Sequence, residues 1–176
     1  MTGRTYPDEP AEEFEVPPLS FEDREGREIE ICPYDGSETE REALVEMYTA
    51  FDPADRAQGI PPSKEERVRE WLSNILAEGC LNVVAWHGDT AAGHATLVPD
   101  RDDYELAIFV LQAYQRAGIG KRLMHALLGY GRDEGVERVW LTVERWNHPA
   151  VNLYQQTGFE TSNAESFELE MTIRLR

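Results

Sequence analysis

Hydrophobic positions in the first half of the chain follow two different periods. Over residues 39–51 and 63–78 they recur every three or four positions, which places them on one face of a helix. Over residues 27–34, 81–87 and 90–98 they alternate with polar residues or form short apolar runs, which is typical of strands. The first half therefore predicts an early hairpin, two helices and a second hairpin.

The second half alternates strands with helices. Residues 104–111 form a strongly apolar strand, and apolar residues over 118–134 lie on one side of a helix that ends at Gly135. The further segments with a regular pattern are a strand over 136–144, a short helix over 149–156 and strands beginning at 159 and 167. This order predicts an α/β fold with a mixed sheet and no internal repeat.

Residues 1–19 show little periodicity and are acidic and proline-containing. Such a segment buries little apolar surface, so we expect a disordered or loosely attached arm. The remaining residues, 20–176, suit a single domain with a sizeable core. The acidic start resembles neither a signal peptide nor a transit peptide, and no apolar run approaches the ~20 residues of a membrane helix. We therefore expect a cytoplasmic protein.

Acidic residues dominate the charge of the chain, whose formal net charge is −17. Nucleic acids and anionic membranes bind basic surfaces, so neither is an expected partner. Lys64 and Lys121 are the only lysines. Abundant glutamate with scarce lysine resembles proteins of salt-adapted organisms, in which salt screens self-repulsion, but an acidic mesophilic protein fits equally well.

Cysteine and histidine are too scattered to suggest a metal site. Without a secretory signal, the two cysteines are expected to be buried thiols rather than a disulfide. The four histidines, His87, His94, His125 and His148, are scattered along the chain and do not have the spacing of metal ligands. We therefore expect no bound metal.

The turn Gln115-Arg116-Ala117-Gly118-Ile119-Gly120 lies between a predicted strand and a predicted helix. Its two glycines let the backbone approach a ligand closely, and the helix start presents unpaired N–H groups and a partial positive charge. Together these features indicate a site for an anion such as a phosphate or pyrophosphate.

Two segments resemble motifs of one protein family. Residues 110–120, Val-Leu-Gln-Ala-Tyr-Gln-Arg-Ala-Gly-Ile-Gly, resemble motif A of the GNAT superfamily, the acyl-CoA-dependent N-acyltransferases. Residues 147–159, Asn-His-Pro-Ala-Val-Asn-Leu-Tyr-Gln-Gln-Thr-Gly-Phe, resemble motif B of the same family. The matched core spans about residues 81–175. The resemblance implies a GNAT-type mixed, mostly antiparallel sheet of about six to seven strands, flanked by about four helices.

The resemblance also implies acetyl-CoA as co-substrate. The edge backbone of the strand that ends at Leu111 would pair with the pantetheine arm as an added strand would. The pyrophosphate would lie on backbone N–H groups of the glycine turn, with Lys121 and Arg122 adding local positive charge. The residues implied in binding are Phe109, Val110, Leu111, Gln115, Arg116, Ala117, Gly118, Ile119, Gly120, Lys121, Asn147 and Tyr154.

Transfer to an amine requires an acid and a base. Tyr154 matches the family tyrosine near the thioester sulfur, where a phenol can stabilise the leaving thiolate by a hydrogen bond or by proton donation. A lysine-like amine is mostly protonated at neutral pH and must lose a proton before it attacks. Glu105 occupies the position of an acid used as base in many relatives, and Glu144 is the second candidate. Thr142 stands where relatives that acetylate certain protein N-termini have their base. Threonine cannot act as a base, so this residue counts against membership of that subclass.

His94 and His148 are weaker candidates for the base, on polarity alone. The main reading is an N-acetyltransferase that moves acetyl directly from acetyl-CoA to a primary amine, because no cysteine lies in either motif to form an acyl-enzyme. The alternative is a sensor or interaction module that binds acyl-CoA. The acceptor would be a small molecule or a protein amine, and the acidic surface favours cationic ones. A homodimer is compatible with the sequence.

Overall fold

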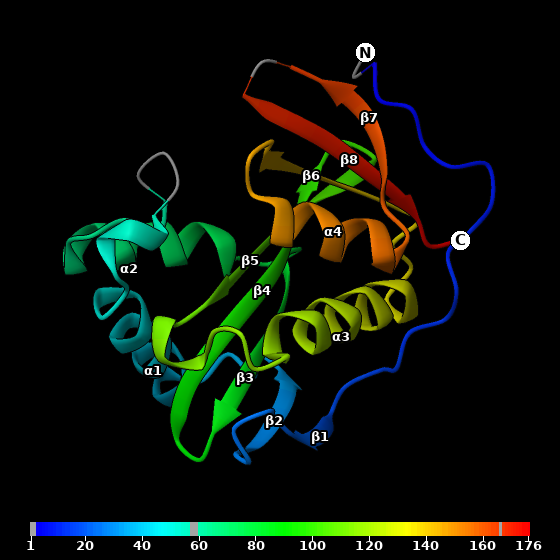
Figure 1. Ribbon diagram of the computed structural model, residues 1–176. Coiled ribbons are helices and arrows are strands. Elements are labelled where there is room, and N and C mark those ends of the chain that lie inside the picture. Colours follow the sequence, from blue (N-terminus) through cyan, green and yellow to red (C-terminus); the bar gives the residue numbers. More distant parts are fainter. Residues whose placement is uncertain (1–2, 57–59, 166) are drawn as a thin grey trace.

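A sheet of eight strands forms the centre of the molecule, and helices cover both of its faces (Figure 1). The computed structural model describes residues 3–56, 60–165 and 167–176. The sheet order is β1-β2-β3-β4-β5-β6-β8-β7. The strands are β1 (Leu19–Glu22), β2 (Glu28–Pro33), β3 (Leu81–His87), β4 (Thr90–Asp100), β5 (Asp103–Val110), β6 (Arg138–Glu144), β7 (Glu160–Ala164) and β8 (Glu168–Arg174). The helices are α1 (Glu38–Thr49), α2 (Glu65–Ile75), α3 (Ile119–Asp133) and α4 (His148–Thr157), with 3₁₀ turns η1 (Pro53–Asp55) and η2 (Gln112–Tyr114).

The α/β class and the mixed, mostly antiparallel sheet with four flanking helices are confirmed. The described residues form eight strands, one more than the upper end of the expected range. Both edge strands are weak in the sequence. β1 has only four residues, and the β7 sequence Glu-Thr-Ser-Asn-Ala has no buried position. Pairing with β2 and β8 holds these two strands at the edges of the sheet.

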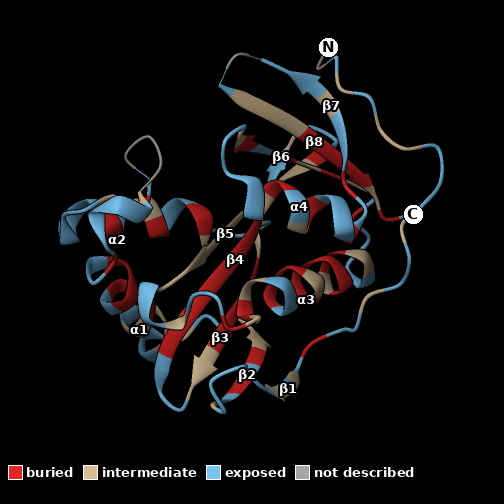
Figure 2. Cartoon of the chain, in the orientation of Figure 1, coloured by how far each residue is buried: buried red, intermediate tan, exposed pale blue. Residues whose placement is uncertain are grey.

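Two hydrophobic cores lie on opposite faces of the sheet. Helices α3 and α4 pack on one face, where Leu123, Leu127 and Leu141 are almost completely buried. Helices α1 and α2 pack on the other face, around Tyr48 and Leu72. Figure 2 shows the buried positions concentrated along the central strands and the inward sides of the helices. Burial of these stripes agrees with the helical periods in the sequence.

Strands β5 and β6 diverge in the middle of the sheet. They are the one parallel pair in the described sheet, and their register contains only Tyr104 with Val139 and Glu105 with Trp140. From Leu106 onward, β5 has no strand partner on that side among the described residues. A slot therefore opens between two central strands, bounded by helices above and below.

The N-terminal segment, expected to be a disordered or loosely attached arm, makes specific contacts with the rest of the chain. The structure places residues 3–18 along the edge of the molecule, from β7 and β8 past α3 to β1 (Figure 1). The Arg174 carbonyl accepts a hydrogen bond of 2.8 Å from the Ala11 N–H, and the Phe14 ring lies 5.2 Å from that of His125. These anchors are single residues between stretches without secondary structure, so no periodic pattern marks them. That residues 20–176 form one domain stays a prediction.

Candidate active site

The slot between β5 and β6 contains a cavity of about 480 Å³. Its walls come from both strands, from the start and middle of α4 and from the loop that follows α1. The predicted site residues that line it are Glu105, Phe109, Glu144, Asn147 and Tyr154. The structure therefore brings together residues that are up to 49 positions apart in the sequence.

The backbone of β5 has free groups on the side of this cavity. The Leu111 N–H donates a 2.9 Å hydrogen bond to the Ala92 carbonyl, so Leu111 and Phe109 direct their backbone groups toward β4. By alternation, Ile108 and Val110 direct theirs toward the slot. The Gln115 side chain donates to the Val110 carbonyl at 3.0 Å, which leaves the Val110 N–H and both groups of Ile108 for a ligand. Of the three predicted residues Phe109, Val110 and Leu111, only Val110 therefore directs its backbone groups toward the slot, where a ligand could bind them.

The glycine turn adopts a conformation that ordinary residues rarely take. Arg116 and Gly118 have φ values of 61° and 88°, in the left-handed region. Gly118 is the N-cap of α3 and gives no side-chain hydrogen bond, so the N–H groups of Ile119, Gly120 and Lys121 have no partner within the helix. An L residue held at positive φ costs about 1 kcal/mol and is frequent at ligand sites. The turn thus has the free donors that an anion requires.

Basic side chains extend from the first turns of α3 into a second cavity of about 940 Å³. Ala117, Gly118, Lys121 and Arg122 lie in its wall, opposite the N-terminal segment. Gln115 points elsewhere: its amide nitrogen donates to Asp55 at 3.1 Å as well as to Val110. The Gln115 side chain therefore connects the glycine turn to η1. Only the backbone of Gln115, and not its side chain, is available to contact a phosphate.

Tyr154 lies on α4, where it is 9% exposed and packs against Phe159 with ring centroids 5.9 Å apart. Burial raises the pKa of Tyr154 to about 12. Its hydroxyl has no hydrogen-bond partner among the residues that the structure describes. A neutral phenol with an unused donor in a cavity wall can stabilise a developing negative charge.

Glu105 and Glu144 lie in opposite walls of the slot, on β5 and β6. Glu105 is half-buried, and the loss of water around it raises the pKa of its carboxyl group. The neighbouring Asp100 raises that pKa further, whereas Arg4 lowers it. A higher pKa makes a carboxylate a stronger proton acceptor, provided that it stays ionised at the working pH.

Asn147 begins α4 as its N-cap. Its side-chain oxygen accepts a 3.4 Å hydrogen bond from the Ala150 N–H, and the residue also lines the slot. The neighbouring His148 is exposed at the first position of the helix. Asn147 therefore fixes the start of the helix that carries Tyr154, whether or not it also contacts a ligand.

His94 is fully buried in a hydrogen-bonded chain and does not line the slot. Its Nε2 lies 2.7 Å from the Asn82 side-chain oxygen, and its Nδ1 lies 2.6 Å from the Tyr48 hydroxyl. Asn82 donates through its own nitrogen to the Ile75 carbonyl, so its oxygen accepts from Nε2–H and Nδ1 accepts from Tyr48. Burial lowers the pKa of His94 to about 3. His94 therefore joins α1 and α2 to the sheet as a neutral side chain.

Several lining residues were not singled out in the sequence, among them Asp55, Arg56, Ile60 and Glu168. The first two lie at η1, where Arg56 donates to the Tyr48 carbonyl at 3.3 Å and its buried Nε has no partner among the described residues. The loop after α1 lacks any periodic pattern, so no sequence signal points to them. Glu168 is the first residue of β8, and the alternating pattern of that strand gives no sign of a functional role.

No group of metal-ligating side chains occurs within residues 3–56, 60–165 and 167–176. Over the same residues, no helix is long and apolar enough to cross a membrane.

Comparison with known proteins gives the same family as the two sequence motifs. The acetyltransferase (GNAT) family model matches residues 41–159. An N-alpha-acetyltransferase 50 from Danio rerio is 26% identical over 97 residues, which cover 52% of this chain and 58% of that protein. An N-alpha-acetyltransferase from Sulfurisphaera tokodaii is 39% identical over 56 residues, 31% of this chain and 34% of that protein. The chain thus spans at most 58% of the length of these relatives.

Solved structures with the same fold cover most of the chain. The GNAT domain of S. lividans PAT superposes with a TM-score of 0.73 at 16% identity, covering 89% of this chain and 96% of that domain. The ribosomal-protein-S18-alanine N-acetyltransferase from Escherichia coli gives 0.64 at 23% identity, with coverages of 82% and 94%. A putative acetyltransferase from Salmonella typhimurium, solved with its cofactor acetyl-CoA, gives 0.64 at 16%, with coverages of 84% and 94%. These structures share the fold, and the family match over residues 41–159 establishes that the chain belongs to the GNAT family of acetyltransferases.

Proposed function

We propose that this chain is an N-acetyltransferase that moves an acetyl group from acetyl-CoA to a primary amine within a ternary complex. The observation that carries the proposal is the slot between β5 and β6, with Tyr154 in its wall and the free helix start of α3 just beyond the end of β5. Membership of the GNAT family supports acetyl transfer in general. The direct mechanism and the amine acceptor are the specific parts of the proposal.

The chain offers groups that suit acetyl-CoA along its length. The N–H groups of Ile119 to Lys121 suit the pyrophosphate, because they are unpaired and lie at the positive end of a helix. The free backbone groups of Ile108 and Val110 suit an amide-rich arm that adds to the sheet as a strand. When bound, acetyl-CoA supplies an acetyl group that is activated as a thioester.

Glu105 is the proposed base and Tyr154 the proposed acid. Glu105 accepts a proton from the ammonium group of the acceptor, directly or through water, and so leaves a neutral amine. The amine nitrogen bonds to the thioester carbon, the carbon–sulfur bond breaks, and the second proton of the nitrogen passes to solvent or to the departing thiolate. Tyr154 then donates a hydrogen bond to the sulfur that leaves as thiolate. With a pKa near 12, the phenol keeps its proton more readily than a thiol does, so Tyr154 acts mainly as a hydrogen-bond donor. Glu144 is the second candidate for the base.

Acidic side chains from four elements, η1, β5, β6 and β8, line the slot. They are Asp55, Glu105, Glu144 and Glu168. A wall of this charge favours a cationic acceptor over a neutral or anionic one. Two of the relatives above are named N-alpha-acetyltransferases, yet Thr142 lines the slot where a base is expected in enzymes for certain protein N-termini. Both α-amines and lysine ε-amines therefore belong in the test.

The test is release of free thiol from acetyl-CoA in the presence of three acceptor types. These are a peptide with a free N-terminus and no lysine, an N-blocked peptide with one lysine, and a polyamine. We expect release with at least one acceptor, mass-spectrometric proof of its acetylation, and loss of activity in Glu105→Gln. Calorimetric binding of acetyl-CoA without acetylation of any acceptor would instead support the sensor module.

A further inference from the structure

Arg4 lies beside the register pair of Glu105 and Trp140, at the point where β5 and β6 separate. Trp140 and Glu105 are register partners on β6 and β5, so their side chains project from the same face of the sheet. Thr142 and Glu144 follow on that face at intervals of two residues, and both line the slot. Arg4 lies on this same face, with its guanidinium carbon 3.6 Å from the centre of the Trp140 ring.

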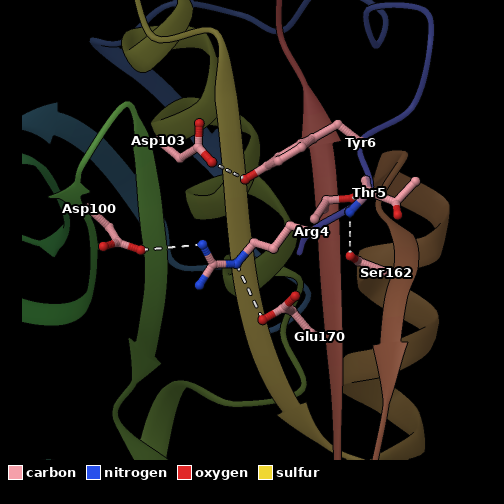
Figure 3. Close-up of polar contacts among 8 residues, drawn as sticks. Arg4, Thr5, Tyr6, Asp100, Asp103, Ser162 and Glu170 are labelled. Atoms are coloured by element: carbon pink, nitrogen blue, oxygen red, sulfur yellow. Dashed lines mark hydrogen bonds and ion pairs between the residues drawn. The ribbon is translucent and has the colours of Figure 1, made fainter. Parts of the chain in front are cut away.

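Arg4 is enclosed by carboxylates as well as by Trp140. One terminal nitrogen of its guanidinium lies 3.4 Å from Asp100 on β4, and its Nε lies 3.3 Å from Glu170 on β8 (Figure 3). The Arg4 side chain is only 10% exposed. A cation in this position is shielded from water and interacts more strongly with nearby carboxylates than an exposed one does.

The neighbours of Arg4 hold the backbone in place. The Thr5 N–H donates to the Ser162 hydroxyl at 2.8 Å, and the Thr5 carbonyl accepts from the Thr172 hydroxyl at 2.6 Å. The Tyr6 hydroxyl donates to Asp103 at 2.7 Å (Figure 3). Three hydrogen bonds on two consecutive residues make the position of Arg4 a built feature of the fold.

We propose that Arg4 is a positioning residue of the acceptor site, which keeps the neighbouring Glu105 in the charged form that a proton acceptor needs. The inference rests on the proposed function in one respect, the role of Glu105 as base. It adds a residue outside the family match, since that match begins at residue 41. It also makes the N-terminal segment part of the site.

Three influences act on the pKa of Glu105. Burial is the largest and raises it, Asp100 raises it as well, and Arg4 lowers it. Loss of Arg4 would remove the cation and leave Asp100 and Glu170 without this partner, so each change moves the pKa upward. The other charged groups of the slot walls are Asp55 and Arg56 beside η1, Glu144 on β6 and Glu168 on β8.

The experiment compares full-length variants by the pH dependence of kcat/KM. Arg4→Gln should move the acidic limb of the profile upward by about one pH unit, the scale of one nearby opposite charge. Arg4→Lys restores the charge and should return most of the shift. Arg67→Gln, which removes an exposed charge from α2, is the matched control and should leave the profile unchanged. Should Arg4→Gln fail to fold by circular dichroism, Arg4→Met takes its place because it keeps an apolar stem on Trp140.

A carbon-13 NMR titration of the Glu105 carboxyl, assigned by its absence in Glu105→Gln, separates this inference from the proposed function. A raised Glu105 titration in Arg4→Gln together with a shifted profile supports both. If the Glu105 pKa is raised in Arg4→Gln but the Glu105→Gln variant is still fully active, Arg4 acts on Glu105 as inferred, and the role of Glu105 as base is overturned. An unchanged Glu105 titration overturns the inference, including the case in which activity falls equally at every pH, because that result indicates a structural role alone.

Discussion

Tyr154 has a different environment from the other buried tyrosine of the described cores. Tyr48 is fully buried, and its hydroxyl donates a 2.6 Å hydrogen bond to His94 Nδ1. The Tyr154 hydroxyl has no hydrogen-bond partner among the described residues. The Tyr154 hydroxyl faces a cavity and is therefore available to donate a hydrogen bond to a ligand there.

We predict that Tyr154→Phe lowers kcat by about 100-fold, the lower range for a positioned proton donor, because the leaving thiolate loses its hydrogen bond. The dissociation constant of acetyl-CoA should change by less than about threefold, since the ring remains. Steady-state kinetics and calorimetry measure the two quantities. Tyr130→Phe on α3 is the control, because Tyr130 is partly buried yet lies outside the slot. Equal turnover in Tyr154→Phe and wild type would remove Tyr154 as the acid.

The sequence predicted the residues that short-range motifs position, and it missed those that tertiary contacts position. Asn147 and Tyr154 belong to one helix, so their spacing alone brings both to the slot wall. Arg56 lies in a loop without periodicity, and its hydrogen bond to the Tyr48 carbonyl exists only in the folded chain. His94 looked like a candidate base because a polar residue in a strand attracts a chemical role. Its partners, Tyr48 and Asn82, are 46 and 12 positions away, and they show it to be structural.

At the scale of elements, the glycine turn and α3 act as one unit. The turn presents free N–H groups at the start of the helix, and Gln112 and Gln115 connect it to the loop after α1. Gln112 donates to the Ala50 carbonyl at 2.7 Å. The loop after α1 and the proposed phosphate side of the slot are therefore linked by two glutamine side chains, a connection that neither segment's own sequence reveals.

We predict that Gly118→Ala weakens acetyl-CoA binding by at least about tenfold, because an alanine at φ 88° strains the turn that holds the free donors. Gly135→Ala is the matched control, since Gly135 follows the other end of the same helix at φ 96° and has open space around it. Both variants should lose about 1 kcal/mol of unfolding free energy in urea titrations. Equal acetyl-CoA affinity in Gly118→Ala and Gly135→Ala would show that the turn does not bind the phosphates.

The N-terminal segment crosses α3 at Gly129. A Cβ at that position would collide with the Glu15 carbonyl oxygen and would lie 3.1 Å from that of Phe14. An alanine inside a helix normally stabilises it by up to about 1 kcal/mol over glycine. Here we predict that Gly129→Ala displaces the segment and speeds its cleavage by a glutamate-specific protease within residues 9–15, as followed by mass spectrometry. Gly135→Ala should leave the cleavage rate unchanged. Equal protection in both variants would contradict close packing of the segment on α3.

At the scale of the whole molecule, the net charge of −17 is the dominant feature. Self-repulsion of a compact acidic chain opposes folding, and at 1 M salt the screening length falls to about 3 Å. We therefore predict that the Tm rises between 0.1 and about 2 M KCl, by about 2–4 °C for each kcal/mol gained. Differential scanning calorimetry measures the change. A Tm that stays constant or falls over this range would contradict stabilisation by screening and exclude salt adaptation as the reason for the acidity.

The overall architecture was largely predictable, because α3, α4 and the strands around them carry strong periodic patterns and two motifs. The course of residues 3–18 was not predictable, because their contacts with β7, β8 and α3 come from isolated residues such as Thr5 and Phe14. The parallel step from β5 to β6 defines the slot, and it follows from topology rather than from the composition of either strand.

The most direct test of the account is a crystal structure of the protein with acetyl-CoA. We predict that the pyrophosphate lies on the N–H groups of Ile119 to Lys121, with the pantetheine arm between β5 and β6. The thioester sulfur should lie within hydrogen-bond distance of the Tyr154 hydroxyl. Acetyl-CoA bound only in the larger cavity between α3 and the N-terminal segment, with the slot between β5 and β6 closed, would contradict the account.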